Sequence, residues 1–297
     1  MRWKVMLRVG VALAAFAMVT TACGQQQDLG GGSSAPPAAQ GARFEPGTTM
    51  ATLAEANTIR IGTKFDQPLF GQRGLDGNLT GFDTDVARII AGALGIPPDK
   101  VQWVESPSAQ REELIKQGKV DLVVATYTIN DKRRQQVSFA GPYYVAGQSL
   151  MVKSDNNTIT GVDSLRGAGA RVCSVQGSTP AETIRTYIDP AQLTVFDVYS
   201  KCADALRTGQ IDVVTTDNVV LLGFVANSNG DFKLVGDTFT QEPYGIGIRK
   251  GDVAFCTFIN DTLTQAATSG AYADAWKTTA GRVAQQTPQL PTSDSCS

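Results

Sequence analysis

The sequence predicts an α/β protein with two lobes and a ligand cleft between them. Three observations lead to this prediction. Apolar strand-like and amphipathic helix-like segments alternate along the body of the chain, which is typical of sheets covered by helices. After an N-terminal leader and a polar segment, about 250 of the 297 residues remain, enough for two lobes of ordinary size. Finally, one helix–Gly–strand unit occurs twice.

The first residues have the pattern of an export signal. Three cations within the first eight residues precede an apolar run over 9–19, and small residues then lead to Cys23. A membrane-spanning helix needs roughly 20 apolar residues, so this run is too short to be one. Residues 20–23 (TTAC) resemble a bacterial lipobox, with Thr20 where Leu is usual. We expect a signal peptide over 1–22 and lipid acylation of Cys23; an ordinary signal peptide with an unrelated Cys is the alternative.

A flexible tether is expected next. Residues 23–49 begin with the acylated Cys and continue with Gly, Ser, Gln, Pro and Ala, a composition that offers little apolar surface to bury. Lipoprotein modification adds several acyl chains, which gives stable anchoring. The sequence therefore predicts a domain held by lipid at the extracellular side of the cell membrane.

The charge of the chain argues against nucleic acid as a partner. Without residues 1–22, 23 Lys and Arg stand against 28 Asp and Glu, a net charge of −5. The one cluster of cations is the KRR triplet over 132–134, too little for a basic face. We also expect a monomer.

The cysteines indicate disulfides. Four Cys remain after Cys23, and an even number in an exported chain is typical of two bridges. We predict Cys173–Cys202 within one lobe and Cys256–Cys296 fixing the C-terminal tail, although the sequence alone leaves other pairings open. The chain has no His and no CxxC pair, so we expect neither a metal site nor a cofactor.

The predicted elements follow one another in α/β order. Strands are expected over 58–64, 101–106, 121–126, 149–154, 170–175, 192–199, 211–216 and 244–250. Helices are expected from a cap near Asp83 to a stop at Gly95 and Pro97, and over 108–119, 179–188, 201–210, 218–228, 252–270 and 271–280. This alternation predicts parallel sheets with covering helices.

The repeated unit points to the cleft. Residues 115–126 (IKQGKVDLVVAT) and 206–217 (LRTGQIDVVTTD) share an apolar-x-x-Gly-x-apolar-Asp-apolar-Val pattern. In both, a buried strand follows the Gly, and the strands end at Thr126 and Asp217. Ligands of open α/β sheets lie outside the carboxyl ends of the strands, so each lobe would supply one wall of the cleft. Chance recurrence of a common α/β unit is the alternative.

Six segments together resemble one family. They read IGTKFDQP, GFDTDVA, SAQREELIKQGKVDLVVATYTINDKRRQQVSFAGPYY, VQGSTPAE, YSKCADAL and GQIDVVTTD. This array is similar to the bacterial extracellular solute-binding proteins of family 3, and among them most to glutamate-binding lipoproteins of actinobacterial ABC importers. The resemblance covers about 50–285. It implies a two-lobed, periplasmic-binding-protein-like fold with two hinge crossings: lobe 1 over 50–145, lobe 2 over 146–240, and a return to lobe 1 with the tail over 241–297.

The resemblance assigns the ligand's α-carboxylate to Arg133, in the segment TINDKR. A guanidinium suits that role because it presents two parallel donors to a carboxylate. Thr126 and Thr128 would assist it, while Lys132 and Arg134 would be solvated neighbours. An exposed helix face carrying all three cations is the alternative.

The resemblance places the remaining contacts to the ligand's α-carbon groups in lobe 2. Ser178 and Thr179 match an anion cradle at a helix start, where free N–H groups and the helix dipole favour a carboxylate. Asp217 matches the acidic residue that holds the ligand ammonium. Simple helix capping is the alternative for all three.

Side-chain recognition is expected from two further cations. By resemblance, Arg111 and Lys64 face the ligand's own acidic side chain, with Ser108 beside Arg111, where glutamine binders tend to carry an aromatic residue. Solvated surface positions are the alternative for both cations. Phe82 and Phe65 are expected to wall the ligand's methylene groups.

The sequence therefore predicts a receptor rather than a catalyst. It would capture glutamate, or aspartate, asparagine or glutamine, and pass it to the membrane permease of an ABC importer. The chain has no GxSxG motif, metal cluster or phosphate-binding glycine loop. Two alternatives remain: a sensor lipoprotein that signals to a membrane kinase, and a dehydratase-like enzyme on the same fold with Asp217 or Glu242 as acid or base.

Overall fold

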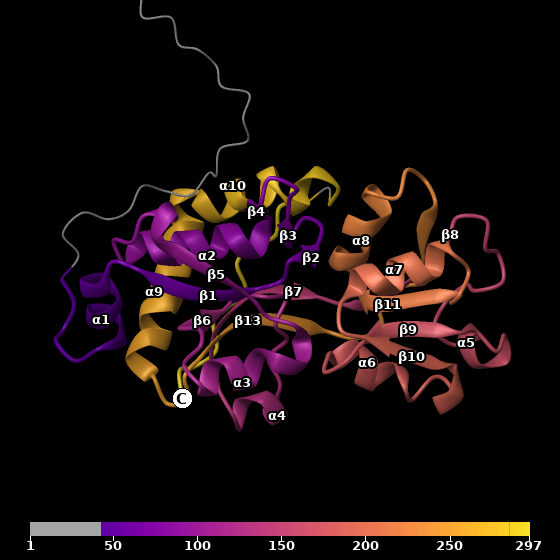
Figure 1. Ribbon diagram of the computed structural model, residues 1–297, viewed down its shortest axis with the longest axis horizontal. Helices are drawn as coiled ribbons and strands as arrows, with labels where there is room; N and C mark the ends of the chain where they lie inside the picture. Colours follow the sequence, from indigo (N-terminus) through magenta and orange to yellow (C-terminus); the bar gives the residue numbers. More distant parts are fainter. Residues whose placement is uncertain (1–42, 285) are drawn as a thin grey trace, which may run out of the picture. The chain divides into compact units, whose positions relative to one another are not determined.

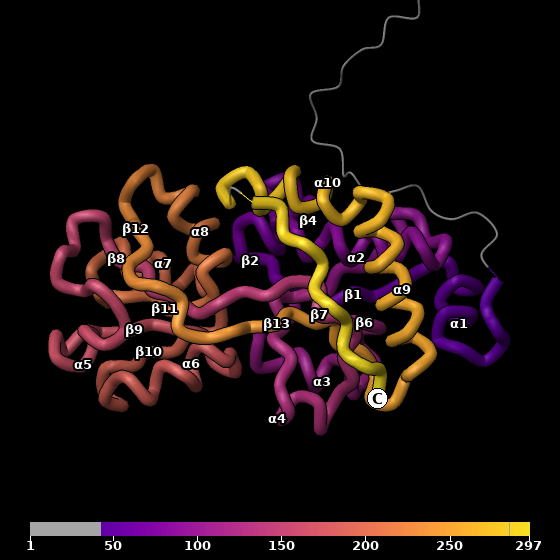
Figure 2. The backbone as a smooth tube through the Cα atoms, turned by 180° about the vertical axis from the view of Figure 1, so that it is seen from behind, coloured from indigo at the N-terminus to yellow at the C-terminus, as the bar shows by residue number. Residues whose placement is uncertain are grey.

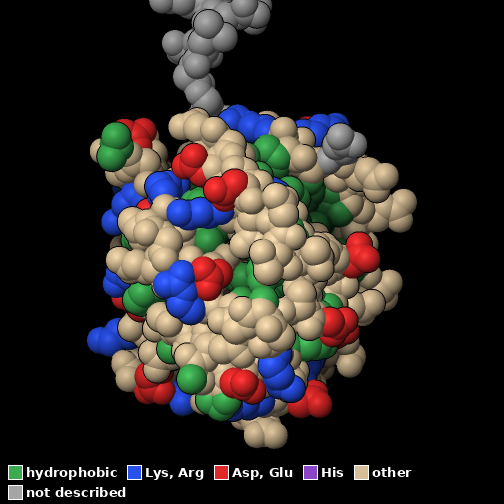
Figure 3. Space-filling view, turned by 90° about the vertical axis from the view of Figure 1, so that its right-hand side faces the viewer, with side chains coloured by type: hydrophobic (Ala, Val, Ile, Leu, Met, Phe, Trp, Pro, Cys, Tyr) green, Lys and Arg blue, Asp and Glu red, His purple; other side chains and the backbone are tan. Residues whose placement is uncertain are grey.

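The computed structural model describes residues 43–284 and 286–297 (Figure 1). The predicted signal peptide, the acylated Cys23 and most of the predicted tether lie outside these residues. Within them, no helix combines the length and apolar character needed to cross a membrane. On the face shown in Figure 3, Lys and Arg side chains are interspersed with Asp and Glu rather than gathered by sign.

The first lobe is built on a five-stranded sheet in the order β5-β1-β6-β13-β7. The strands are β1 Ile59–Thr63, β5 Val101–Glu105, β6 Leu122–Val123, β7 Ser138–Ala146 and β13 Glu242–Ile248. The helices of this lobe are α1 Thr49–Ala56, α2 Phe82–Ala93, α3 Arg111–Lys116, α4 Asp131–Arg134, α9 Val253–Ser269 and α10 Ala271–Thr278. A small antiparallel sheet of β2 Asp66–Gln67, β3 Gly71–Arg73 and β4 Leu79–Thr80 extends from it.

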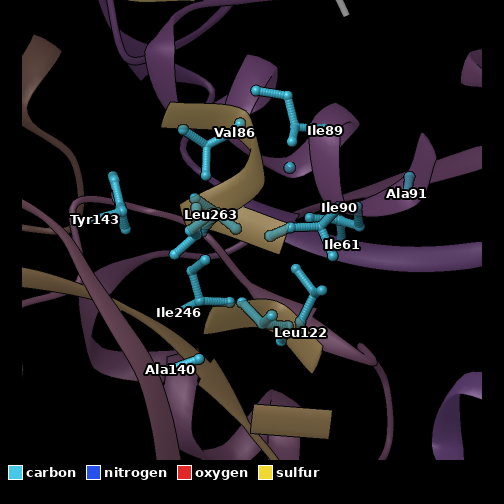
Figure 4. Packing of buried hydrophobic residues seen from close by; sticks show 14 of the residues in the cluster. Ile61, Val86, Ile89, Ile90, Ala91, Leu122, Ala140, Tyr143, Ile246 and Leu263 are labelled. Carbon is cyan, nitrogen blue, oxygen red and sulfur yellow. The ribbon is translucent and has the colours of Figure 1, made fainter. Parts of the chain in front are cut away.

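Side chains on the two faces of this sheet pack into separate cores. Successive residues of a strand point to opposite faces, so Leu122 joins the cluster that includes Val86 of α2 and Leu263 of α9 (Figure 4). Val123 instead joins the cluster that includes Ile115 of α3. The central strands are therefore buried on both faces, which explains why their sequences are almost entirely apolar.

The second lobe has its own five-stranded sheet, in the order β10-β9-β11-β8-β12. Its strands are β8 Gln148–Lys153, β9 Val172–Val175, β10 Leu193–Phe196, β11 Val213–Asp217 and β12 Phe232–Val235, and its helices are α5 Ser164–Gly167, α6 Thr179–Ile184, α7 Tyr199–Arg207 and α8 Asn218–Ala226. Single 3-10 turns occupy Pro98–Lys100, Ser108–Gln110, Pro190–Gln192 and Ala280–Arg282.

The chain passes between the sheets twice, through β7–β8 and β12–β13 (Figure 2). β7 and β13 pair antiparallel, from Ser138 opposite Ile248 to Ala146 opposite Glu242. β8 likewise pairs antiparallel with β11 and β12. The expected parallel pairing is present between β1 and its neighbours β5 and β6, and between β9 and its neighbours β10 and β11. The expectation of parallel sheets is therefore met only in part, because the strands that cross between the lobes, β7, β8 and β13, pair antiparallel.

Several predicted boundaries differ in the structure. β6 is two residues long where a strand over 121–126 was expected, because the chain leaves the ladder to form the cleft. The expectation of a tether up to residue 49 also needs correction at its end. The Phe44 ring packs edge-on against Phe258 with centroids 5.5 Å apart, and Thr48 caps α1.

Both predicted disulfides are present. Cys173–Cys202 joins β9 to α7 within the second lobe. Cys256–Cys296 joins α9 to the C-terminal tail. The tail also pairs with lobe 1 through an ion pair between Asp294 and Arg134.

Both copies of the helix–Gly–strand unit carry the same Arg–Asp ion pair, the Arg–Asp lock. In lobe 1 Asp121 accepts hydrogen bonds from the backbone N–H and the guanidinium of Arg60, which also donates to the carbonyl of Gly118 at 2.6 Å. In lobe 2, Asp212 and Arg171 make the same contacts, with the carbonyl of Gly209 at 2.9 Å. Each lock fixes the turn before a central strand and so the place where that strand begins.

The two locks differ in burial, which gives a matched test. The Asp121 side chain is 15% exposed and that of Asp212 is 35% exposed. We expect Asp121→Ala to lower the free energy of unfolding by about 1–2 kcal/mol, because it leaves partly buried donors of Arg60 without their acceptor. Asp212→Ala should cost less, because water can replace the carboxylate. Urea unfolding of both variants measures the difference, and equal losses would contradict it.

Candidate functional site

One small pocket brings together seven of the ten predicted ligand-binding residues. It is lined by Ser108, Arg111, Thr126, Thr128, Ser178, Thr179 and Asp217, together with Pro180, Tyr199 and Thr216. Thr126 follows β6 and Asp217 ends β11, so the pocket lies where the two repeated units end. Its volume is about 10 Å³, roughly the space of one water. An amino acid can therefore enter only when the contacts across the pocket open.

Arg111 forms part of the lobe 1 wall. Arg111 is the first residue of α3. Its side chain lies over the ring of Tyr127, with the guanidinium carbon 4.1 Å from the ring centroid. Nη1 donates to the carbonyls of Ala125 at 2.9 Å and Thr126 at 3.4 Å. Nε has no partner. The residue is 2% exposed, so the alternative of a solvated surface cation is wrong for Arg111.

Lys64 lies beside this wall and is 3% exposed, so it is not a surface cation either. Its Nζ donates to the hydroxyl of Ser108 at 2.9 Å. Burial, assisted by the charge of Arg111, lowers the pKa of Lys64 to about 7. Among the described residues, no ion pair joins Lys64 or Arg111 to a carboxylate. Lobe 1 thus presents two buried basic side chains that make no ion pair within the described residues.

Arg133 is buried, so the alternative of an exposed helix face is wrong for it, while Lys132 is exposed. Its Nη1 donates to the carbonyl of Thr128 at 2.6 Å, and Nη2 reaches across to the carbonyl of Gly177 at 3.1 Å. Nε lies 3.4 Å from Glu112 Oε1. Burial, and then the charge of Arg111, lower its pKa to about 10. Arg133 does not line the pocket itself, but it contacts Thr128 of one wall and connects the two walls through Gly177.

A buried aspartate holds the Thr126 loop. Thr126 has a left-handed backbone, with φ of 44°, a strained conformation for a β-branched residue. Its N–H donates to Asp83 Oδ2 at 2.8 Å, and Asp83 Oδ1 accepts from the Tyr143 hydroxyl at 2.7 Å. Burial raises the pKa of Asp83 to about 7, against the effect of these hydrogen bonds. Helix α2 begins at Phe82, near Asp83 as expected, but its N-cap is Gly81, and the Asp83 side chain anchors the cleft instead.

The lobe 2 wall begins at the turn before α6. Ser178 caps this helix, accepting from the N–H of Ala181 at 3.1 Å, so the capping alternative is correct for Ser178. Thr179 instead donates to Glu242 Oε2 at 2.7 Å, and its hydroxyl lies 3.3 Å from that of Thr128. The Thr128 and Thr179 hydroxyls thus face each other across the two walls.

Asp217 supplies a free acceptor. Although it stands at the N-cap position of α8, its side chain makes no cap hydrogen bond, so the capping alternative fails. Oδ2 accepts from the Tyr244 hydroxyl at 2.6 Å, whereas Oδ1 has no partner. Burial, and then the nearby charge of Glu242, raise the pKa of Asp217 to about 7.

Phe82 and Phe65 do not take part in the pocket. Phe82 is fully buried, with its ring centroid 5.1 Å from Trp276 and 5.4 Å from Tyr272. The expectation that it walls a ligand is therefore wrong, and its role is in the lobe 1 core. Phe65 lies under the guanidinium of Arg73, 3.8 Å from the ring centroid.

Sequence reasoning missed three residues of the pocket, namely Pro180, Tyr199 and Thr216. The hydroxyl of Tyr199 is buried without a partner, and burial beside Asp217 raises its pKa to about 12. A signal for two of them was available. Thr216 directly precedes Asp217 in the repeated unit, and Tyr199 stands in the segment YSKCADAL that carries the resemblance.

The pocket contains buried polar atoms that lack hydrogen-bond partners within the described part of the chain. Three of its buried atoms have no partner among the residues that the structure describes: Arg111 Nε, the Tyr199 hydroxyl and Asp217 Oδ1. Such groups are costly unless a ligand or water satisfies them. One side offers cationic donors and the other an acceptor, which fits a small zwitterion with an additional anionic group. A larger groove of about 740 Å³ runs between α9, α10 and residues 288–293, but Asp261 is the one charged residue of its lining.

Comparisons with known proteins agree with this architecture. A model of the bacterial extracellular solute-binding proteins, family 3, matches residues 59–278. The chain is 39% identical over 237 residues to "Glutamate-binding protein GluB" of Corynebacterium efficiens, covering 77% of this chain and 80% of the relative. It is 37% identical over 230 residues to "ABC transporter glutamine-binding protein GlnH" of Bacillus subtilis, covering 77% and 83%.

A solved structure shows the same fold. "An ancestral arginine-binding protein bound to glutamine" superposes with a TM-score of 0.69 at 36% identity, covering 74% of this chain and 96% of that one. The predicted two-lobed fold of the periplasmic-binding-protein type is thus confirmed.

The position of Phe82 gives a test that separates core from pocket. Phe82→Leu should lower the free energy of unfolding by about 1–2 kcal/mol, because it leaves part of a fully buried ring site unfilled. The ratio of affinities for different amino acids should not change, because the ring does not reach the pocket. Urea unfolding measures the loss of stability, and calorimetry measures the ratio of affinities. A changed ratio would show that Phe82 does contact the ligand.

Proposed function

Because the chain belongs to the bacterial extracellular solute-binding proteins of family 3, we propose that it binds an acidic amino acid, glutamate first, between its lobes. It then delivers this amino acid to the membrane permease of an ABC importer. The observation that carries the proposal is the pair of buried cations, Lys64 and Arg111, that have no carboxylate partner among the described residues. A bound side-chain carboxylate would neutralise both.

The α-carbon groups of the ligand are assigned to the two walls. Arg133 takes the α-carboxylate, exchanging its contact with the carbonyl of Gly177 for the ligand oxygen, while the Thr128 hydroxyl donates beside it. Asp217 takes the ammonium through Oδ1, the oxygen without a partner. Each assignment pairs a buried group with an opposite charge, which burial otherwise makes costly.

The ligand side chain is assigned to the part of the pocket formed by Arg111 and Ser108 of lobe 1. Arg111 Nε is a donor without a partner among the described residues, and Lys64 stands behind Ser108. An amide side chain would leave at least one of these cations without an anion. Such a mismatch costs roughly 2–5 kcal/mol, which corresponds to a preference of about tens to thousands-fold for glutamate over glutamine.

The small pocket makes lobe movement part of the function. A volume of about 10 Å³ admits no amino acid, so the ligand binds an open form and the lobes close over it by a hinge. The hinge lies in the β7–β8 and β12–β13 crossings. We further propose that the protein acts as a monomer without catalysis, exported and anchored through Cys23.

Calorimetry on refolded protein from residue 24 onward, with glutamate, aspartate, glutamine and asparagine, tests the proposal directly. Wild-type protein should bind glutamate tightly and glutamine far more weakly. Arg133→Ala should abolish binding of all four, because the α-carboxylate is common to them. Arg111→Met should weaken glutamate by about tens to thousands-fold and glutamine much less. Equal losses for both ligands in Arg111→Met would contradict side-chain recognition, and a lack of binding by wild type would overturn the function.

The two shifted pKa values predict different pH limits for different ligands. Lys64 faces Arg111, Arg133, Asp66 and Asp83, and its pKa is about 7 without ligand. A bound side-chain carboxylate raises the pKa of Lys64, so Lys64 takes up a proton when glutamate binds above pH 7. The affinity for glutamate should therefore fall as the pH rises above 7, by up to about tenfold per pH unit. Glutamine, which has no such charge, should be nearly unaffected there.

The acid side depends on Asp217, which faces Glu242, Tyr244, Arg111 and Arg133 and has a pKa of about 7. A bound ammonium lowers this pKa, so binding below pH 7 releases a proton and every amino acid should lose affinity as pH falls. Calorimetry across pH 5 to 9 should show that the affinity for glutamate is highest near neutrality and falls on both sides, along an acid and an alkaline limb. The affinity for glutamine should fall on the acid side alone. Lys64→Met is the control that removes the alkaline limb, and coincident profiles in the wild type would refute the assignment.

A further inference from the structure

We propose that Gly223 of α8 is a closure residue: the lack of a side chain there lets lobe 2 seat against Pro68 of lobe 1, and a methyl group at that position holds the pocket open. The inference rests on the proposed function, because closure matters only if a ligand is enclosed. It concerns a residue outside the pocket lining.

The close approach at Gly223 is specific to the other lobe. A Cβ atom on Gly223 would lie 2.5 Å from the carbonyl oxygen of Pro68, 3.1 Å from its carbonyl carbon and 3.1 Å from its Cβ. These three nearest atoms all belong to Pro68, which follows β2 in lobe 1. Because the nearest contact is backbone, no rotamer change can relieve it. The methyl group would force the lobes apart at this contact.

A second glycine makes a similar contact at another place where the walls meet. A Cβ atom on Gly177 would lie 2.7 Å from Cα and 2.9 Å from N of Ala109, in the 3-10 turn of lobe 1. Gly177 has φ of +75°, a left-handed conformation that glycine adopts without strain. A substitution there would therefore disturb the turn as well as the contact. Gly223 lies inside a helix, where alanine is compatible with the backbone, and so isolates the contact.

The contacts between the lobes are neighbours of the pocket in sequence. Ala109 follows Ser108, and Gly177 precedes Ser178. On the Pro68 side, the N–H of Ser200 donates to Asp66 Oδ2 at 3.1 Å, and Ser200 follows Tyr199. Seating the lobes therefore brings Ser108, Ser178 and Tyr199 to the pocket together. A gap at Gly223 would keep these groups from enclosing a ligand.

Glycine also has a cost at this position. It is the least favourable helix residue after proline, because it adds backbone freedom to the unfolded chain. α8 packs on its own lobe through other residues, among them Val220, Leu221 and Phe224. A helix-stabilising alanine would suit the fold of lobe 2 at least as well as glycine does. We therefore assign the glycine to closure rather than to folding.

The decisive experiment is Gly223→Ala in the protein from residue 24 onward, with Gly167→Ala as the matched control. Gly167 ends another helix of lobe 2, and a Cβ atom there would meet nothing within 4 Å. Calorimetry measures the affinities for glutamate and glutamine. Small-angle X-ray scattering measures the decrease in radius of gyration on adding glutamate, and thermal unfolding without ligand measures the stability of each variant.

We expect Gly223→Ala to weaken glutamate and glutamine by the same factor, about tenfold or more, because closure is common to both. It should lose the ligand-induced compaction, while its melting temperature without ligand stays equal to or above that of wild type. Gly167→Ala should behave as wild type in binding and compaction.

Unchanged affinity and compaction in Gly223→Ala would overturn the inference. So would a fall in its ligand-free melting temperature, because the glycine would then serve the fold of lobe 2. A selective loss of glutamate alone would also contradict a role in closure. Failure of wild type itself to bind would instead overturn the proposed function, and with it the inference, so the two failures are distinguishable.

Discussion

The structure depends on buried charge that the protein does not itself neutralise. Lys64 and Arg111 lie in lobe 1 without a carboxylate partner among the described residues, and Asp217 faces them with one oxygen unpaired. Isolated charges of this kind are costly in a protein interior. The cost is moderated by dipoles rather than by ion pairs: backbone carbonyls and the face of Tyr127 hold Arg111, and the hydroxyl of Ser108 holds Lys64.

That arrangement requires rigid supports, and the two lobes supply them in the same way. The Arg–Asp locks at Asp121 and Asp212 fix the turns that begin β6 and β11, so the far ends of these strands meet at one pocket. Asp83 then holds Thr126 in a left-handed conformation against the core tyrosine Tyr143. The pocket is thus built from the ends of rigid elements, which keeps its donors and acceptors oriented before a ligand arrives.

The same geometry links recognition to movement. Antiparallel crossings through β7–β8 and β12–β13 leave two connections between the sheets, and the other contacts between the lobes include polar ones such as that between Arg133 and the carbonyl of Gly177. Contacts of this kind exchange readily for ligand or water. A cleft held by them can open, whereas a large apolar interface between the lobes would resist separation.

The sequence by itself determined the alternation of elements, the presence of two disulfides and the two strand ends that meet at the pocket. Local patterns carry these features: hydrophobic periodicity marks strands and helices, and the repeated unit marks equivalent strand ends at Thr126 and Asp217. The resemblance to family 3 added five further pocket residues: Ser108, Arg111, Thr128, Ser178 and Thr179. Tertiary structure alone decided that Phe82 lies in the core, that Asp83 anchors a loop instead of capping a helix, and that Gly223 approaches Pro68. The physical reason is that burial, unpaired hydrogen-bonding atoms and close backbone contacts depend on which distant segments meet, and no local pattern records that.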